Sequence, residues 1–365
     1  MLTGTSVICR SLVRCTQYLN LFPLTISGFS SVKSNMASSA KPKVLLTRSD
    51  YSPSAVNLLK QHFDVKTWDS EKHGTISKDT LIQLIRGKAG ILVTTSNLID
   101  QEVIASGAPS LQVVSTMSVG VDHVDLKALK EFNVRLGYNF DVNVHATAEL
   151  TVGLLLATSR RIIEASAAVK SDRWTSNSGS FRWLCGQGLH DSTVGIIGYG
   201  KIGHSVAMKL RSFSPGRIFY TSRKEKPNGN AIGAVLTDLD TLLKSCNFVV
   251  LTLALTPETR GIISRSKIAL MKENAIFINT GRGGLVDQEA LVAALQQGKI
   301  LGAGLDVMSP EPLPQDHPLE RLDNCVLLPH IGSDTAKSID DACLRAAENI
   351  VAVLEGTPMP AEYPL

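Results

Sequence analysis

The chain has 365 residues, of which 44% are apolar and 19% charged, and its formal net charge is +4. This composition argues against a disordered chain or a membrane protein, and the length favours two domains. Residues 1–40 contain three of the 37 basic residues and none of the 33 acidic ones, so the remainder is nearly neutral. A neutral body argues against a nucleic-acid-binding surface.

The first 40 residues differ from the rest of the chain. They are rich in Ser and Thr, and Arg10, Arg14 and Lys33 are their only charges. This composition is typical of a mitochondrial transit peptide. An apolar stretch in the segment would suit a signal peptide, but a proline interrupts it, and translation from Met36 is a third interpretation. We exclude residues 1–40 from the fold and expect a mitochondrial or cytoplasmic protein.

Three further features narrow the class of protein. The six cysteines form no C-x-x-C pair, which predicts reduced thiols, and no His/Cys cluster has the spacing of metal ligands. The longest apolar helical run, residues 150–157, is too short to span a bilayer and is flanked by charges. We therefore expect no metal site, no membrane association and no disulfide framework.

From residue 43, short apolar runs alternate with helical stretches. Apolar strands that are each followed by a helix indicate a parallel sheet covered on both faces. Strands are predicted at residues 44–47, 90–94, 113–115 and 135–137, and helices at 54–62 and 126–132. Residues 41–142 are thus predicted to form an α/β domain of flavodoxin-like type.

Residues 143–170 have the longest helical pattern, with apolar and small residues all round its middle. Such a helix is expected between two bodies, so it is predicted to be a single helix at the first interdomain hinge. Residues 173–190 are rich in Trp, Ser and Gly and are predicted to form a long loop or arm.

A second alternating series begins at residue 193. Six strands with intervening helices predict a doubly wound (Rossmann) sheet. The predicted strands are 194–197, 218–221, 248–252, 275–279, 303–306 and 326–328, and the predicted helices are 202–213, 239–245, 268–271 and 288–297. A last helix, about 338–355, is expected to return to the first domain. The chain is therefore predicted to be a dinucleotide-binding domain, residues 143–330, inserted into a smaller substrate-binding domain, residues 41–142 and 331–365.

A G-x-G-x-x-G sequence follows the first strand of this second series and opens a helix, which is the context that a dinucleotide site needs. Gly198 allows a tight turn, Gly200 lets backbone amides approach a pyrophosphate, and Gly203 allows close packing of helix on strand. Lys201 and Ile202 begin the helix, whose N-terminus favours an anion.

The turn after the second strand of this series has no acid at the position where NAD-specific sites bind the ribose hydroxyls. Ser222, Arg223, Lys224 and Lys226 stand there instead. A hydroxyl followed by three cations suits a 2′-phosphate, with Arg223 forming charge-assisted bonds. The turn favours NADP(H), and NAD(H) is the alternative.

Three reactive side chains follow predicted strands of the same domain: Arg282, Glu311 and His330. Reduction of a 2-keto acid requires a cation for the carboxylate, a proton donor for the developing alkoxide and a hydride source. Arg282 suits the first role and His330 the second, while Glu311 would orient His330 and raise its pKa. A strand-capping histidine and a surface ion pair are the alternatives for these residues taken singly.

The glycine loop, the Arg-Gly turn at 282–283, the Glu-Pro turn at 311–312 and the Pro-His-Ile-Gly sequence at 329–332 together resemble the D-isomer-specific 2-hydroxyacid dehydrogenases, over about residues 43–360. Within that family the likeness is to the glyoxylate/hydroxypyruvate reductases, through residues 115–123, 183–186, 309–314 and 328–333. The resemblance implies catalytic roles for Arg282, Glu311 and His330.

The resemblance also implies contacts at further positions. It implies substrate contacts from Thr95, Ser96, Val119, Gly120, Gly332 and Ser333, in addition to Arg282 and His330. It implies cofactor contacts from Thr280 and Asp306, in addition to the glycine loop and the basic turn. It further implies a homodimer, in which Trp183 of the arm could reach the neighbouring site. Gly281 and Asp334 depart from the usual residues of the family.

The expected function is NADPH-dependent reduction of glyoxylate to glycolate and of hydroxypyruvate to D-glycerate. The alternative from another class is a dehydrogenase-like corepressor that senses NAD(H) and has no turnover, because such proteins retain a similar triad. A formate dehydrogenase is disfavoured because it typically has Gln in place of Glu311. A phosphoglycerate dehydrogenase is disfavoured because the acid expected after the second strand is missing.

Overall fold

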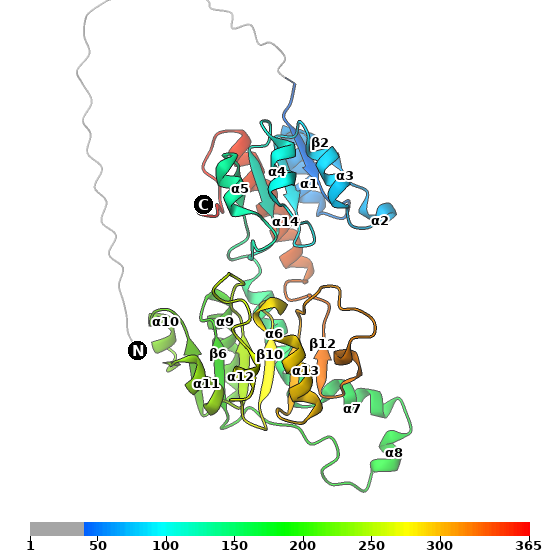
Figure 1. Cartoon of the computed structure of the whole chain (residues 1–365), viewed down its shortest axis with the longest axis vertical. Coiled ribbons are helices and arrows are strands. Elements are labelled where there is room, and N and C mark those ends of the chain that lie inside the picture. The colour runs from blue at the N-terminus through cyan, green and yellow to red at the C-terminus, as the bar shows by residue number, and fades with distance from the viewer. Residues whose placement is uncertain (1–39) are drawn as a thin grey trace, which may run out of the picture. The chain divides into compact units, whose positions relative to one another are not determined.

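The computed structural model describes residues 40–365, and the predictions for the N-terminal extension lie outside the described residues. Two parallel sheets organise this part of the chain, five-stranded and seven-stranded (Figure 1). Both sheets alternate with helices along the chain, which confirms the predicted α/β fold class. Of the helices in residues 40–365, none combines the length and the apolar character needed to cross a bilayer.

The first sheet has the strand order β2-β1-β3-β4-β5, which is flavodoxin-like. Its strands are β1 (Lys43–Leu46), β2 (Asp64–Thr67), β3 (Gly90–Val93), β4 (Val113–Thr116) and β5 (Arg135–Gly137). β3 and β4 are buried along their whole length, as expected for the central strands of a sheet covered on both faces. The edge strand β2 was not predicted, because Asp-Val-Lys-Thr is mostly polar and exposed.

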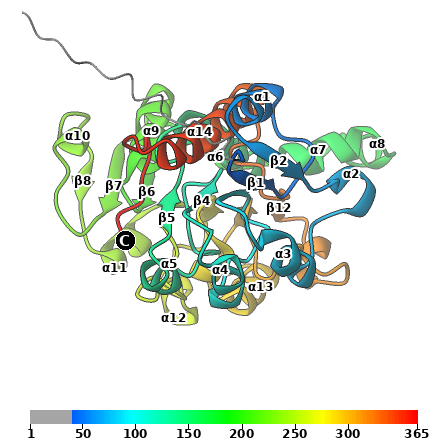
Figure 2. The same ribbon diagram turned by 90° about the horizontal axis from the view of Figure 1, so that it is seen from above.

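Two layers of helices cover this sheet. α1 (Pro53–His62) and α14 (Ala336–Leu354) pack together, and α14 also contacts β3, β4 and β5. α3 (Lys78–Ile85), α4 (Gln101–Gly107) and α5 (Leu126–Glu131) pack in the other layer, and α2 (Ser70–His73) is a short exposed turn. Side chains of β1 alternate between the layers: Val44 and Leu46 face α1 and α14, whereas Leu45 faces α3 and α4. The last helix therefore returns to the first sheet (Figure 2).

The second sheet has the strand order β12-β11-β10-β9-β6-β7-β8. The strands after β6 are added first on one side of it (β7, β8) and then on the other (β9 to β12), so the strand order reverses between β6 and β9. Its strands are β6 (Thr193–Ile197), β7 (Arg217–Thr221), β8 (Val235–Leu236), β9 (Phe248–Leu251), β10 (Ile276–Asn279), β11 (Gly302–Leu305) and β12 (Cys325–Leu327). The prediction of six strands was wrong by one, because β8 is a two-residue edge strand too short to give a periodic signal. Ligands bind at such a reversal point in doubly wound sheets.

Helices lie on both faces of the second sheet. α6 (Val144–Ser159) and α9 (Lys201–Leu210), which continues as η1 (Arg211–Phe213), pack on one face. α11 (Leu239–Ser245), α12 (Arg265–Ile268) and α13 (Gln288–Gln296) pack on the other. The short elements are α10 (Pro227–Asn230), η2 (Gly283–Leu285) and η3 (Pro318–Arg321). The helix predicted at 268–271 was placed too late in the chain, because the observed helix α12 ends at Ile268.

The single helix predicted over residues 143–170 is also wrong. α6 ends at Ser159, Arg161 is left-handed with φ 52°, and α7 (Ile162–Val169) begins a new direction. A segment distant in sequence causes the break, because the Ser159 carbonyl accepts a hydrogen bond from the Gln187 amide at 2.8 Å. The arm is not all loop, since it contains α8 (Arg173–Asn177), and α7 and α8 extend away from the second sheet (Figure 1).

Candidate active site

A cleft of about 1060 Å³ is lined by loops that follow strands of both sheets. Because the strands are parallel, their carboxyl ends bring these loops together. The predicted site residues that line the cleft are Thr95, Ser96, Val119, Gly120, Ile202, Thr280, Arg282, Asp306, Glu311, His330, Gly332 and Ser333. The predicted residues that do not line it are Gly198, Gly200, Lys201, Gly203, Ser222, Arg223, Lys224 and Lys226.

His330 and Glu311 form a hydrogen-bonded pair in this cleft. His330 Nδ1 lies 2.8 Å from Glu311 Oε2, and the second carboxylate oxygen accepts a hydrogen bond from the Met308 amide at 2.9 Å. Both carboxylate oxygens are thus engaged, which fixes the orientation of the imidazole and leaves Nε2 as its other polar atom. His330 has φ 58°, a left-handed conformation that a non-glycine residue adopts at a cost of about 1–2 kcal/mol.

The pKa values of this pair move apart. The hydrogen bond with Glu311 raises the pKa of His330 above its ordinary value, against an opposing effect of burial. Burial alone would raise the pKa of Glu311, but the hydrogen bonds from His330 and the Met308 amide outweigh it and the pKa is lowered. Both shifts favour a charged carboxylate beside a proton-holding imidazole.

Asp306 supports the turn that carries His330. Its side chain is almost fully buried, and its carboxylate accepts a hydrogen bond from the Ile331 amide at 2.8 Å. Burial raises the pKa of Asp306, with the Ile331 hydrogen bond opposing that shift. A side chain at Gly332 would begin 3.0 Å from the same carboxylate, so the backbone passes close to it. Asp306 therefore fixes the two residues that directly follow His330.

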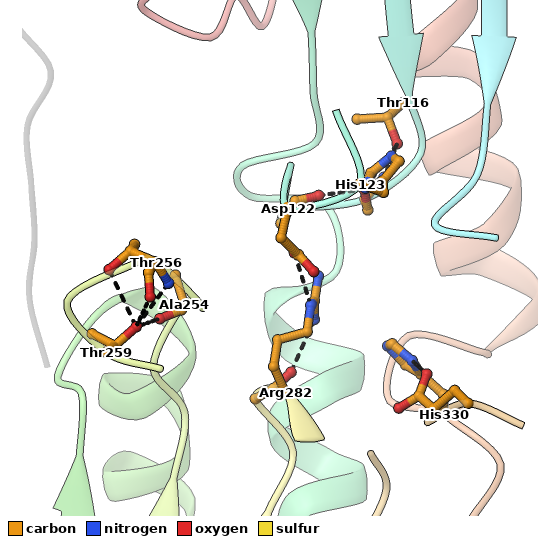
Figure 3. Close-up of polar contacts among 12 residues, drawn as sticks. Thr116, Asp122, His123, Ala254, Thr256, Thr259, Arg282 and His330 are labelled. Carbon is orange, nitrogen blue, oxygen red and sulfur yellow. Dashed lines mark hydrogen bonds and ion pairs between the residues drawn. The ribbon is translucent and has the colours of Figure 1, made fainter. Parts of the chain in front are cut away.

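Arg282 is held from three directions at the end of β10. Asn279 accepts from the Gly281 amide at 3.0 Å and donates to the Arg282 carbonyl at 2.9 Å, which shapes the turn. The guanidinium donates through Nη1 to the Gly281 carbonyl at 2.9 Å and through Nε to Asp122 at 3.0 Å. Figure 3 shows Arg282 reaching Asp122 on the loop after β4, with His330 on a separate loop.

Sequence reasoning missed this partner of Arg282. Asp122 lies within the segment 115–123 that carried the family resemblance, but no pattern distinguished its side chain from a surface acid. The only available signal was an acid two residues after Gly120, a predicted substrate contact. Two other loops also reach the cleft wall: the loop after β9, closed by the Thr259 hydroxyl on the Ala254 carbonyl at 2.8 Å (Figure 3), and the loop of Arg48 after β1.

The glycine loop has the backbone that a diphosphate needs. Gly198 has φ 95°, and its carbonyl accepts a hydrogen bond from Thr252 at 2.7 Å. A side chain at Gly203 would begin 2.3 Å from that carbonyl, so only glycine fits there. Around Gly200, in contrast, there is open space, and α9 starts at Lys201 without a side-chain cap. The uncapped helix N-terminus beside open space fits a bound diphosphate.

The turn after β7 presents cations without counter-charges. Arg223 and Lys224 are exposed, and neither they nor Lys226 forms an ion pair with another residue in the described part of the chain. The Lys226 amide donates to the Tyr220 hydroxyl at 2.9 Å, and Glu225 accepts from Asn230 at 2.9 Å. The backbone of the turn is therefore held in place while its cations stay available to an anionic ligand.

Among residues 40–365, no group of three His, Cys, Asp or Glu side chains is arranged to hold a metal ion. The four cysteines of this range are free thiols. Burial raises the pKa of Cys246 and of Cys325 to about 12. Cys343 is the one of these four that lines the cleft, and burial raises its pKa as well. A buried neutral thiol of this kind is inert.

Comparison with known proteins places the chain. Residues 152–332 match the family described as D-isomer specific 2-hydroxyacid dehydrogenase, NAD binding domain. The human glyoxylate reductase/hydroxypyruvate reductase is 44% identical over 303 residues, 83% of this chain and 91% of that protein. The glyoxylate reductase of Thermococcus onnurineus is 39% identical over 323 residues, 88% and 95% of the two chains.

Solved structures show the same likeness. The TT0316 protein of Thermus thermophilus superposes with a TM-score of 0.81 at 38% identity, covering 88% of this chain and all of that one. An NADPH-dependent glyoxylate/hydroxypyruvate reductase of Sinorhizobium meliloti, solved with NADP and malonate, has a TM-score of 0.77 at 26% identity, covering 89% and 97%. The chain belongs to the D-isomer-specific 2-hydroxyacid dehydrogenase family. It is an NAD(P)-dependent oxidoreductase, as the sequence predicted.

Proposed function

We propose that the protein reduces small 2-keto acids with NADPH, converting glyoxylate to glycolate and hydroxypyruvate to D-glycerate. The observation that carries the proposal is the His330–Glu311 pair, at 2.8 Å, in one cleft with the guanidinium of Arg282. Relatives named glyoxylate reductase/hydroxypyruvate reductase, 44% identical in human and mouse, support this choice of substrates.

Arg282 is proposed to bind the substrate carboxylate and to polarise the keto group. A guanidinium suits a planar carboxylate because two parallel N–H groups can be donated to it. The Val119–Gly120 backbone and the hydroxyls of Thr95 and Ser96 line the same cleft and would complete the carboxylate site. On the opposite loop, Gly332 and Ser333 follow the histidine along the cleft wall.

His330 is proposed to donate the proton that the developing alkoxide needs. Its raised pKa favours the protonated imidazolium, and the hydrogen bond to Glu311 stabilises that cation. As the proton leaves, Glu311 stays ionised and continues to hold Nδ1, so the donor returns to the same orientation. A general acid of this kind contributes about 10²–10⁴-fold to the rate.

The cofactor would lie on the loop of Gly198, Gly200 and Gly203, with the amides of Lys201 and Ile202 at its diphosphate. The nicotinamide supplies the hydride when it is bound. Thr280 and Asp306 line the cleft between that loop and the histidine, and are proposed to contact the cofactor there. Ser222, Arg223, Lys224 and Lys226 would bind the 2′-phosphate, so NADPH is proposed as the preferred cofactor over NADH.

We further propose that α7 and the arm together join two copies of the chain into a homodimer. Apolar side chains that monomers usually bury are exposed along α7 and the arm. They are Ile162 (49% exposed), Ile163 (57%), Val169 (61%), Trp174 (58%) and Phe181 (102%). Replacing Ile163 and Val169 by Asp should halve the mass measured by light scattering, whereas Leu301→Asp, exposed outside the arm, should not.

The N-terminal extension is proposed to direct the protein to mitochondria. Its support is compositional, because residues 1–40 carry Arg10, Arg14 and Lys33 and no acid. Fusing residues 1–40 to a fluorescent protein should give mitochondrial fluorescence, and a chain started at Met36 should remain in the cytoplasm. Cytoplasmic fluorescence from the fusion of residues 1–40 would contradict the proposal.

Turnover separates the reductase from the corepressor-like alternative, which would bind the dinucleotide without consuming it. With hydroxypyruvate and NADPH, the proposal predicts loss of the reduced-cofactor absorbance and formation of D-glycerate in equal amounts. Tight cofactor binding without any turnover of hydroxypyruvate or glyoxylate would favour the binding module.

A further inference from the structure

The contact between Arg282 and Asp122 joins the loops of the two sheets. Asp122 follows β4 and Arg282 follows β10, yet Arg282 Nε donates to Asp122 Oδ1 at 3.0 Å. Arg282 is half-buried and Asp122 lies at the edge of the cleft as an exposed residue, although only 19% of the Arg282 side chain and 29% of the Asp122 side chain are exposed. Partly buried charge-assisted hydrogen bonds of this kind are stronger than surface pairs.

The guanidinium is held on one side and available on the other. A guanidinium has five N–H groups, and Arg282 uses only Nε, on Asp122, and one group of Nη1, on the Gly281 carbonyl, for hydrogen bonds to residues 40–365. Nη2 lies against Gly120, where a side chain would begin 2.0 Å from it. The edge formed by Nη1 and Nη2 therefore keeps donors for a carboxylate, while Asp122 fixes the opposite end.

Asp122 is itself fixed by a buried polar chain. The neighbouring His123 is 8% exposed and its Nε2 lies 3.1 Å from the Thr116 hydroxyl, at the end of β4. That hydroxyl is 2.8 Å from the Ser118 hydroxyl, which donates to the Gly120 carbonyl at 2.6 Å. The turn from Gly120 to Asp122 is thus tied to the rigid end of a buried strand (Figure 3).

His123 adds no positive charge to compete for Asp122. Burial lowers the pKa of His123 to about 4, with Asp122 opposing and Arg282 reinforcing that shift. The imidazole is therefore neutral near neutral pH, and the cation that pairs with the Asp122 carboxylate is Arg282.

We infer that Asp122 is a positioning residue for the reaction, which clamps Arg282 so that its free edge meets the carboxylate of a 2-keto acid. This inference rests on the proposed function of the cleft. Asp122 itself lines the cleft, and the inferred role is to act on the substrate through Arg282. Without the clamp, the long arginine side chain regains rotational freedom and the carboxylate must be bound at an entropic cost.

The test compares Asp122→Asn, Arg282→Lys and the double variant with the wild type. Asp141→Asn is the matched control, because Asp141 also pairs with an arginine, Arg345 at 3.4 Å, but lines no part of the cleft. The readouts are the dissociation constant of oxamate, an unreactive 2-keto acid analogue, in the presence of NADPH, the dissociation constant of NADPH, and KM and kcat for hydroxypyruvate.

For Asp122→Asn we expect oxamate dissociation constant and KM to rise about tenfold or more, kcat to fall by less than about threefold, and NADPH binding to stay unchanged. In the Arg282→Lys background, Asp122→Asn should have no further effect, because the clamp acts through the guanidinium. Asp141→Asn should match the wild type. Asp122→Ala, which leaves the site open without new hydrogen bonds, should repeat the result of Asp122→Asn.

Unchanged or tighter oxamate binding in Asp122→Asn and Asp122→Ala would overturn the inference. The Asp122 carboxylate would then either have no effect on substrate binding or compete with the substrate for Arg282. An effect that persists undiminished in the Arg282→Lys background would overturn it too. A wild-type protein that binds oxamate but reduces no keto acid would contradict the proposed function, and the binding comparison would still decide the role of Asp122.

Discussion

The wall of the cleft that carries Arg282 and His330 and the turn that carries Arg223 differ in whether their charged side chains are paired with other residues. On the wall both of these groups have a partner: Arg282 has Asp122 at 3.0 Å, and His330 has Glu311 at 2.8 Å. On the turn Arg223 and Lys224 are exposed, Lys226 is half-buried, and none of the three forms an ion pair with another residue of the described chain.

The difference suggests that the two regions have different functions, reaction at the wall and cofactor recognition at the turn. Groups that act on a reacting centre must be held in place before substrate arrives, so neighbouring residues fix their geometry. Groups that recognise a charged ligand can wait for the ligand to supply the counter-charge. Changes to His330 or Arg282 themselves should therefore lower the chemical rate, whereas changes on the turn should alter only the affinity for one cofactor.

The largest effect is expected at His330. His330→Ala should lower kcat by about 10²–10⁴-fold, because the alkoxide loses its proton donor. The dissociation constant of NADPH, measured by fluorescence titration, should stay close to that of the wild type. Near-normal turnover in this variant would remove His330 from the chemistry and break the distinction between wall and turn.

The second largest effect on catalysis is expected for Arg282→Ala. Loss of the guanidinium removes charge-assisted bonds to the keto acid and leaves Asp122 unpaired, so kcat/KM should fall by about 10²-fold. Both KM and kcat should change, as steady-state kinetics with hydroxypyruvate would show. A rise in KM with unchanged kcat would mean that Arg282 binds the substrate without assisting its reduction.

The smallest effect is expected on the turn, and it should be selective. Arg223→Ala should raise the KM for NADPH about tenfold through loss of a bond to the 2′-phosphate, with little change for NADH or in kcat. Arg265→Ala, an exposed cation on α12, is the matched control. Equal losses with NADPH and NADH would show that the turn does not read the 2′-phosphate, and a wild-type preference for NADH would overturn the cofactor assignment.

The core of both sheets could be predicted from sequence because most of its strands are short apolar runs rich in Val, Ile and Leu. The misses have local physical causes. β2 and β8 are polar or very short edge strands, and the break at Arg161 depends on the backbone of Gln187 bonding to Ser159. Pairings of this long-range kind leave no periodic trace in the sequence.

The candidate site shows the same limit. Arg282, Glu311 and His330 could be found because each follows a strand, and parallel strands bring such positions to one edge. The pairing of Asp122 with Arg282 could not be found, because it depends on how closely two loops, 160 residues apart in sequence, approach each other. Side chains at strand ends are predictable, but their partners across the cleft require the structure.

The pH dependence of kcat/KM for hydroxypyruvate, in the wild type and in Glu311→Gln, tests most directly whether His330 gives the proton. Glu311 raises the pKa of His330, and the protonated imidazole is the active form, so the rate should fall as the pH rises through that pKa. Gln keeps a hydrogen bond but removes the charge, so the fall should move to lower pH. The same alkaline limb in both enzymes would contradict the account.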